Sequence, residues 1–103
     1  MELIKKDSCG IEIEYIEMGK LEWLLQEAKI PYRIDYVIGM PSVRYYGHGK
    51  NLICDVICHS GSYGHEEGLL EIMGLTRNGD SVEGWLTSEE VFDRISEDWN
   101  KGN

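Results

Sequence analysis

The chain has 103 residues, of which 42% are hydrophobic and 10% aromatic. A chain of this length folds as one domain and buries about two-thirds of its unfolded surface, so the composition excludes a disordered protein. Its 19 acidic and 10 basic residues give a formal charge of −9, which repels nucleic acid and anionic membranes and attracts basic surfaces. We therefore predict a single domain over residues 1–103 that does not bind DNA or RNA directly.

The N-terminal residues and the cysteines indicate the cellular compartment of the protein. Residues 1–7 carry charges where a signal peptide needs an apolar stretch, and no run approaches the ~18 apolar residues of a membrane span. The cysteines are Cys9, Cys54 and Cys58, and an odd number does not suit the disulfide framework of a secreted protein. We expect a soluble, cytoplasmic protein whose cysteines are thiols or metal ligands.

Two elements are predicted before Pro31. Residues 11–15 alternate apolar and charged side chains, as in a half-buried strand, and a short strand over 2–6 could precede it. Leu21, Leu24, Leu25 and Ala28 then follow the spacing of an amphipathic helix, which we place at residues 19–29 and which Pro31 ends.

The middle of the chain is rich in Tyr, Val and Ile and is interrupted by glycine-containing turns. This pattern predicts three strands in a meander, over residues 32–38, 43–47 and 51–59. The third is almost continuously apolar, which favours a central strand covered on both faces. Asp55 within it needs a polar partner.

The last third of the chain is predicted to be helical. Residues 66–73 fit a short helix ended by Gly74. Thr87 and Glu90 have the spacing of a capping box, and Phe92, Ile95 and Trp99 form the apolar stripe of the helix that follows. These elements predict an α+β fold of two layers, in which two or three helices pack on an antiparallel sheet of about four strands.

Cysteine and histidine side chains gather between residues 54 and 65. Thiolate and imidazole are the usual ligands of a structural zinc ion, and the candidates are Cys54, Cys58, His59 and His65. In an extended strand Cys54 and Cys58 lie ~13 Å apart, so the site is expected at the end of the strand, with Cys54 or Cys9 as the fourth ligand. Two alternatives stay open: ordinary buried thiols, and a nucleophilic Cys58 activated by a histidine.

Acidic side chains line two predicted surfaces. On the last helix Glu89, Asp93 and Glu97 recur every four residues, Glu90 and Asp98 widen the face, and Arg94 alone offsets it. Glu12 and Glu14 form the polar face of the predicted 11–15 strand. Such faces are either solvated or dock a basic partner.

Three segments resemble a family of small phage and prophage proteins of Firmicutes: residues 18–32, 54–74 and 82–95. Small acidic phage proteins of this kind include anti-CRISPR inhibitors of type II effectors, and the chain resembles that class. The resemblance implies a non-enzymatic inhibitor that binds a basic surface of a host RNA-guided nuclease and blocks DNA loading or cleavage. The alternative is a structural or regulatory phage protein with a zinc-stabilised Cys/His loop.

Overall fold

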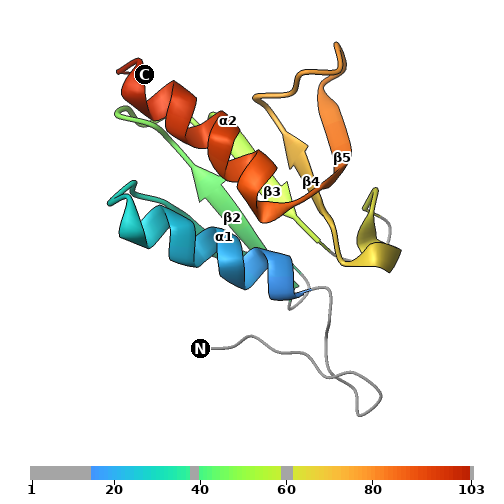
Figure 1. Cartoon of the computed structure of the whole chain (residues 1–103). Helices are drawn as coiled ribbons and strands as arrows, with labels where there is room; N and C mark the ends of the chain where they lie inside the picture. Colours follow the sequence, from blue (N-terminus) through green and yellow to red (C-terminus); the bar gives the residue numbers. More distant parts are fainter. Residues whose placement is uncertain (1–14, 38–39, 59–61, 103) are drawn as a thin grey trace.

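The computed structural model describes residues 15–37, 40–58 and 62–102 (Figure 1). The elements in chain order are α1 (Tyr15–Glu27), β1 (Arg33–Val37), β2 (Met40–Tyr45), β3 (Cys54–Ile57), the 3-10 helix η1 (His65–Glu67), β4 (Leu70–Met73), β5 (Val82–Leu86) and α2 (Ser88–Asn100). All five strands form one antiparallel sheet in sequence order. Both long helices lie on the same face of this sheet (Figure 1). The α+β prediction is confirmed, with five strands instead of about four.

The hydrophobic core lies between the sheet and the two helices. Because successive side chains of a strand point to opposite faces, every second residue of β2, β3 and β4 faces the helices. Registered pairs carry this apolar layer from Val43 to Val56 and on to Ile72. The fully buried side chains that meet in the core are Met18, Leu21, Leu25, Val43, Tyr45, Cys54, Val56, Cys58, Leu70, Ile72, Val91 and Ile95.

The first helix begins earlier than the sequence predicted. It spans Tyr15–Glu27 rather than 19–29, and it buries Met18 together with the predicted Leu21 and Leu25, whereas Ala28 is exposed. The predicted strand over 11–15 therefore fails at its last residue, Tyr15, which starts α1; its residues 11–14, and the possible strand over 2–6, lie outside the described residues.

Helix α2 matches its prediction closely. Thr87 is the N-cap: the Glu90 backbone N–H donates to Thr87 Oγ1 at 3.2 Å, and the Thr87 N–H donates to Glu90 Oε1 at 2.8 Å. This reciprocal pair satisfies two of the backbone donors that a helix start leaves open. Of the predicted stripe, Ile95 is fully buried and Phe92 and Trp99 are partly buried.

The prediction of a helix over residues 66–73 is wrong. The segment divides into η1 and strand β4, with Gly68 at φ 74° between them. A left-handed residue ends a helix, so the apolar run after Gly68 continues as a strand. Strand β5 was not predicted at all, since its pattern is interrupted by Gly84.

Strand β3 is central in the sheet, as predicted, but its two faces differ. Cys54 and Val56 are buried beneath the helices, while Asp55 and Ile57 are partly exposed on the opposite face. Asp55 has the polar partners that it needs, because Ser42 Oγ donates to its carboxylate and Arg44 Nε lies 3.9 Å from it. The prediction that both faces are covered is therefore too strong.

The apolar layer ends at an ion pair between the sheet and α2. Glu83 of β5 is registered with Ile72 and so faces the helices. Arg94 of α2 donates to both Glu83 carboxylate oxygens, at 2.8 and 3.3 Å, and to the Leu75 carbonyl at 3.2 Å. These bonds, and the Arg77 backbone N–H, hold the pKa of the Glu83 carboxyl below its ordinary value. The pair fixes α2 against the edge of the sheet.

Acidification should weaken the fold partly through Glu83. Because its pKa is lowered in the folded chain, the carboxylate contributes stability above its unfolded pKa of about 4.5 and loses that contribution as the pH falls through the lower folded value. Urea unfolding between pH 6 and pH 3 should therefore show a smaller loss of stability in Glu83→Gln than in the unmodified chain. Glu27→Gln, which changes an exposed carboxyl on α1, is the control. An equal loss in Glu83→Gln and the unmodified chain would contradict the role of the pair.

Candidate functional site

The exposed side of α2 carries three carboxylates in a row. Glu89, Asp93 and Glu97 are spaced by four residues, and their side chains are 65%, 67% and 59% exposed. Because residues four apart are neighbours on one side of a helix, the three form one continuous strip, which we call the acidic strip. It is part of the predicted acidic helix face.

Two cations lie against the acidic strip, and neither is the predicted one. Arg77 reaches Asp93 Oδ2 at 3.4 Å and Glu97 Oε1 at 3.0 Å, and Lys20 Nζ lies 3.8 Å from Glu89 Oε2. Arg94, expected to offset this face, is instead buried against Glu83. Exposed ion pairs of this kind each contribute at most about 1 kcal/mol, so a partner's cations can compete with Arg77 and Lys20.

Two other acidic residues of α2 serve the fold. Glu90 is occupied by the capping box, and Asp98 accepts a hydrogen bond from the Tyr45 hydroxyl at 2.7 Å. Burial first, and then this carboxylate, raise the pKa of Tyr45, so the hydroxyl stays protonated as the donor. The predicted partner-binding role of these two residues stays a prediction, and Glu12 and Glu14 lie outside the described residues.

An exposed aromatic pair joins Tyr63, just before η1, to Trp85 of β5, and the sequence did not predict it. The rings of Tyr63 and Trp85 are stacked, with centroids 5.4 Å apart and planes inclined by 19°. Each residue is 56% exposed. The one signal in the sequence is that each ring has a glycine beside it, in Tyr63-Gly64 and in Gly84-Trp85. We call these two rings the aromatic pair.

A β-bulge in β5 turns Trp85 outward. Leu70 is registered with Leu86 but Ile72 with Glu83, so two residues of β5, Gly84 and Trp85, stand opposite Glu71 alone. One extra residue in one strand bends it and redirects its side chains. Trp85 takes a left-handed backbone conformation, φ 57°, as part of this bulge.

The backbone around the bulge holds Tyr63 beside Trp85. The Trp85 N–H donates to the Tyr63 carbonyl at 3.2 Å, and the Tyr63 N–H donates to the carboxylate of buried Glu71 at 2.7 Å. A Cβ at Gly64 would lie 2.8 Å from the Trp85 nitrogen, and one at Gly84 would lie 2.7 Å from the Tyr63 oxygen. The two segments approach so closely that only glycine fits at either position.

Of the five candidate zinc ligands, three lie among the described residues. Cys54 and Cys58 are both buried and lie four residues apart, and His65 lies in η1. Cys54 donates its thiol hydrogen to the Gly74 carbonyl at 3.6 Å, and burial raises its pKa to about 12. Within residues 15–37, 40–58 and 62–102, no three His, Cys, Asp or Glu side chains are grouped so as to hold a metal ion. His59 and Cys9 lie outside those ranges, so the zinc site stays a prediction.

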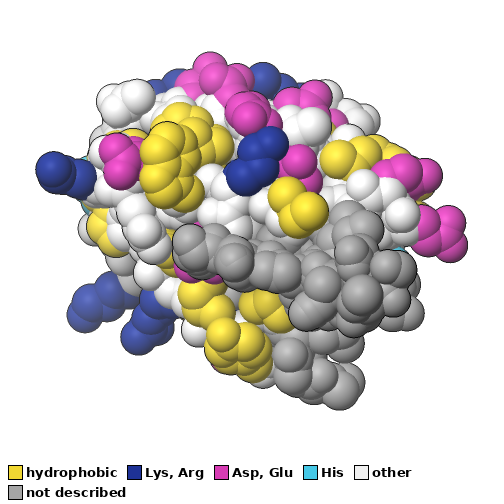
Figure 2. Space-filling model, turned by 60° about the horizontal axis from the view of Figure 1, so that its bottom comes forward, with side chains coloured by type: hydrophobic (Ala, Val, Ile, Leu, Met, Phe, Trp, Pro, Cys, Tyr) yellow, Lys and Arg dark blue, Asp and Glu magenta, His cyan; other side chains and the backbone are white. Residues whose placement is uncertain are grey.

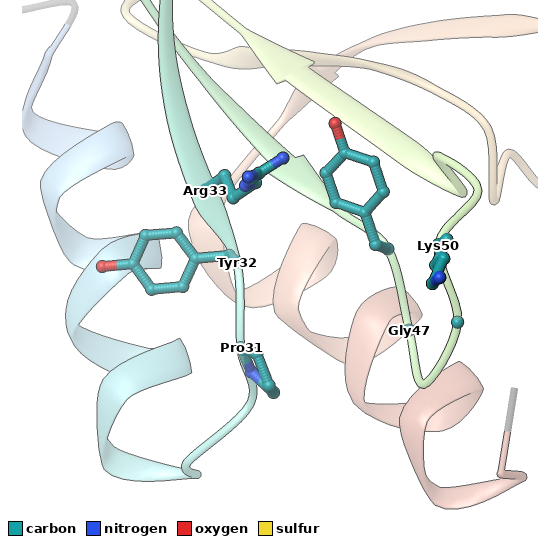
Figure 3. Close-up of a pocket in the computed structure, with 7 residues that line it drawn as sticks. Pro31, Tyr32, Arg33, Gly47 and Lys50 are labelled. Carbon is teal, nitrogen blue, oxygen red and sulfur yellow. The ribbon is translucent and has the colours of Figure 1, made fainter.

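Two basic residues line a pocket at the start of β1. The pocket has a volume of about 330 Å³ and is lined by Pro31, Tyr32, Arg33, Tyr46, Gly47, Gly49 and Lys50. Figure 3 shows that Arg33 and Lys50 approach it from β1 and from the turn after β2. The Arg33 guanidinium lies 5.7 Å from the centre of the Tyr46 ring. Two cations with no acidic residue in the lining suit a small anion.

Acidic and basic side chains are interspersed on the surface (Figure 2). Figure 2 shows acidic side chains along the upper border of one face, and Lys and Arg side chains among them, near the centre and at the lower left. Within the described residues, Arg77 and Lys20 offset part of the charge of the three carboxylates of the acidic strip, which keeps a net negative charge.

Comparisons of the chain with protein-family models, with curated proteins and with solved structures found no match. The resemblance to small phage proteins thus stays a prediction. No helix within the described part of the chain has the length and apolar character needed to cross a membrane.

The buried cysteines should be chemically inert in the folded chain. A thiol reacts as its thiolate, and Cys54 has a pKa of about 12 and is 0% exposed, as is Cys58. Iodoacetamide at pH 7.5 followed by peptide mass spectrometry should leave both unmodified in buffer and label both in 8 M urea. Rapid labelling of Cys58 in the folded chain would contradict its burial and revive the nucleophile hypothesis.

Proposed function

We propose that the chain is a non-enzymatic binding protein whose acidic strip docks on a basic surface of another protein. The observation that carries the proposal is the strip itself: three carboxylates of Glu89, Asp93 and Glu97, more than half exposed on one side of a capped, well-packed helix. The core fixes the helix, so the charges are presented in a preset geometry and little ordering is required on binding.

The partner that we propose is a type II RNA-guided nuclease of the host cytoplasm. Such effectors hold nucleic acid in positively charged channels, and a row of carboxylates on a rigid helix can occupy a site that phosphates otherwise fill. The resemblance to small phage proteins directs the proposal to this class of partner. Binding there would block DNA loading or cleavage, and it requires no catalytic residue of this chain.

A structural zinc ion remains part of the proposal for the loop after β3. Cys58, His59 and His65 would be its ligands, with Cys54 or Cys9 as the fourth. In the alternative function, a structural or regulatory phage protein, this ion would do no more than hold the loop. Metal analysis of untagged protein tests the zinc: about one ion per chain supports it, and a small fraction of that removes it.

Neutralising the acidic strip should weaken inhibition. In a DNA-cleavage assay with several purified type II effectors, the unmodified chain should reduce cleavage of at least one, and Asp93→Asn/Glu97→Gln should require at least a tenfold higher concentration for the same effect. The charge-matched control is Glu27→Gln/Asp80→Asn, which removes two exposed carboxylates that do not belong to α2. It should inhibit as the unmodified chain does.

The salt dependence provides the second criterion. Screening between exposed charges grows steeply with ionic strength, so affinity for the effector should fall between 50 and 500 mM NaCl, and fall less for the strip variant. Undiminished cleavage at large molar excess against every effector would refute the nuclease as partner. Equal inhibition by the strip and control variants would refute the acidic strip as the docking surface.

A further inference from the structure

The aromatic pair is held in place at an energetic cost. Trp85 has φ 57°, a conformation that bulky residues rarely adopt, and strain of this kind persists where the surrounding structure enforces it. Here the bulge, the Trp85–Tyr63 backbone bond and the buried Glu71 carboxylate enforce it. Residues that are strained and over-determined in this way cluster at binding sites.

Packing inside the chain does not account for where the two rings point. Tyr63 and Trp85 are each 56% exposed, although stacked aromatic rings are among the most favourable groups to bury. Trp23 on α1 is similarly exposed, at 59%, but it belongs to a regular helix and has a negative φ. A single exposed tryptophan is ordinary; a strained, stacked and rigidly held pair suggests a prepared surface.

Three exposed carboxylates that are close to the pair in the chain indicate the kind of side chain that it binds. Glu66 and Glu67, both exposed, follow Gly64 in η1, and Glu89 of the acidic strip follows Trp85 by four residues. Aromatic faces with carboxylates nearby attract cations, and the planar guanidinium of arginine both stacks on a ring and bonds to carboxylates. The ammonium of lysine cannot stack in this way. Nucleobases also stack on aromatic rings, but the charge of −9 repels their phosphates.

We propose that the aromatic pair of Tyr63 and Trp85 binds an arginine side chain of the basic partner, with the guanidinium stacked on the exposed ring face. This inference rests on the proposed function and adds a second anchor to the acidic strip. The strip supplies long-range attraction that any cation satisfies, whereas the pair distinguishes arginine from lysine. Aromatic residues and arginine are the side chains most often found at the energetic centres of interfaces.

Two peptides of equal charge separate these contributions. Nona-arginine and nona-lysine, titrated into the chain at 50 mM NaCl, should both bind. The ratio of the nona-arginine affinity to the nona-lysine affinity should be about 2- to 5-fold higher for the unmodified chain than for a variant that lacks the pair, as one exposed cation–π contact provides. In Trp85→Gly this excess preference should disappear. Trp23→Ala, which removes an equally exposed indole elsewhere, should retain it.

Trp85→Gly is the decisive variant because glycine accepts φ 57° without strain. Its urea midpoint should equal or exceed that of the unmodified chain, so that a loss of preference cannot be attributed to unfolding. If this variant nevertheless unfolds, Tyr63→Leu provides the same test of the arginine preference, because it keeps the bulk of the side chain but removes the ring.

The possible results distinguish this inference from the proposed function. An unchanged arginine preference in Trp85→Gly and Tyr63→Leu overturns the inference. If Asp93→Asn/Glu97→Gln still weakens the binding of both peptides in that case, the proposed role of the acidic strip stands. If the strip variant binds both peptides normally but Trp85→Gly loses the preference, the inference stands and the strip fails. Binding of oligo(dT) that depends on Trp85 would identify a base-stacking site and overturn the arginine assignment.

Discussion

The ion pair between Glu83 and Arg94 is the interaction on which the arrangement of the α2 side depends. The apolar layer of the sheet passes from Val43 through Val56 to Ile72, and the next residue in register is the carboxylate of Glu83. An unpaired carboxylate beneath a helix is strongly unfavourable. Arg94 resolves this by turning into the interface, where it is 8% exposed. The rotation of α2 about its axis is thereby set.

Both proposed binding features follow from that arrangement. With Arg94 turned inward, the only basic residue of α2 is withdrawn from its surface, and Asp93 and Glu97 on the outer side meet Arg77 instead. In the sheet, Glu83 pairs with Ile72 and Leu86 pairs with Leu70. One residue of β4 lies between these two pairs but two residues of β5 do, so β5 holds one extra residue. The bulge that accommodates it turns Trp85 out into solvent. The acidic strip and the aromatic pair therefore share one structural origin.

The sequence predicted the elements whose signals are local. The Thr87–Glu90 capping box, the apolar stripe of α2, the buried Leu21 and Leu25 of α1 and the meander through β3 all depend on residues close together in the chain. The failures at β4 and β5 have long-range causes. Residues 69–73 fit a helical spacing as well as a strand, and pairing with β3 decides the outcome. Strand β5 was not predicted because the bulge at Gly84 breaks the alternation of side chains along the strand.

The candidate site was predictable to a similar degree. The spacing of Glu89, Asp93 and Glu97 placed them on one side of a helix, but the inward turn of Arg94 and the approach of Arg77 depend on tertiary contacts. The aromatic pair joins two residues that lie 22 positions apart in the chain, one in a loop and one in a strand. No local sequence pattern therefore predicts it.

The most direct test of the account is an NMR titration of the isotopically labelled chain with nona-arginine. The account predicts that the largest shift changes occur at the Trp85 indole N–H and at the amides of Glu89, Asp93 and Glu97, with the Trp23 indole unaffected. Changes centred instead on Arg33, Lys50 and the pocket between them, or spread evenly over the surface, would contradict it.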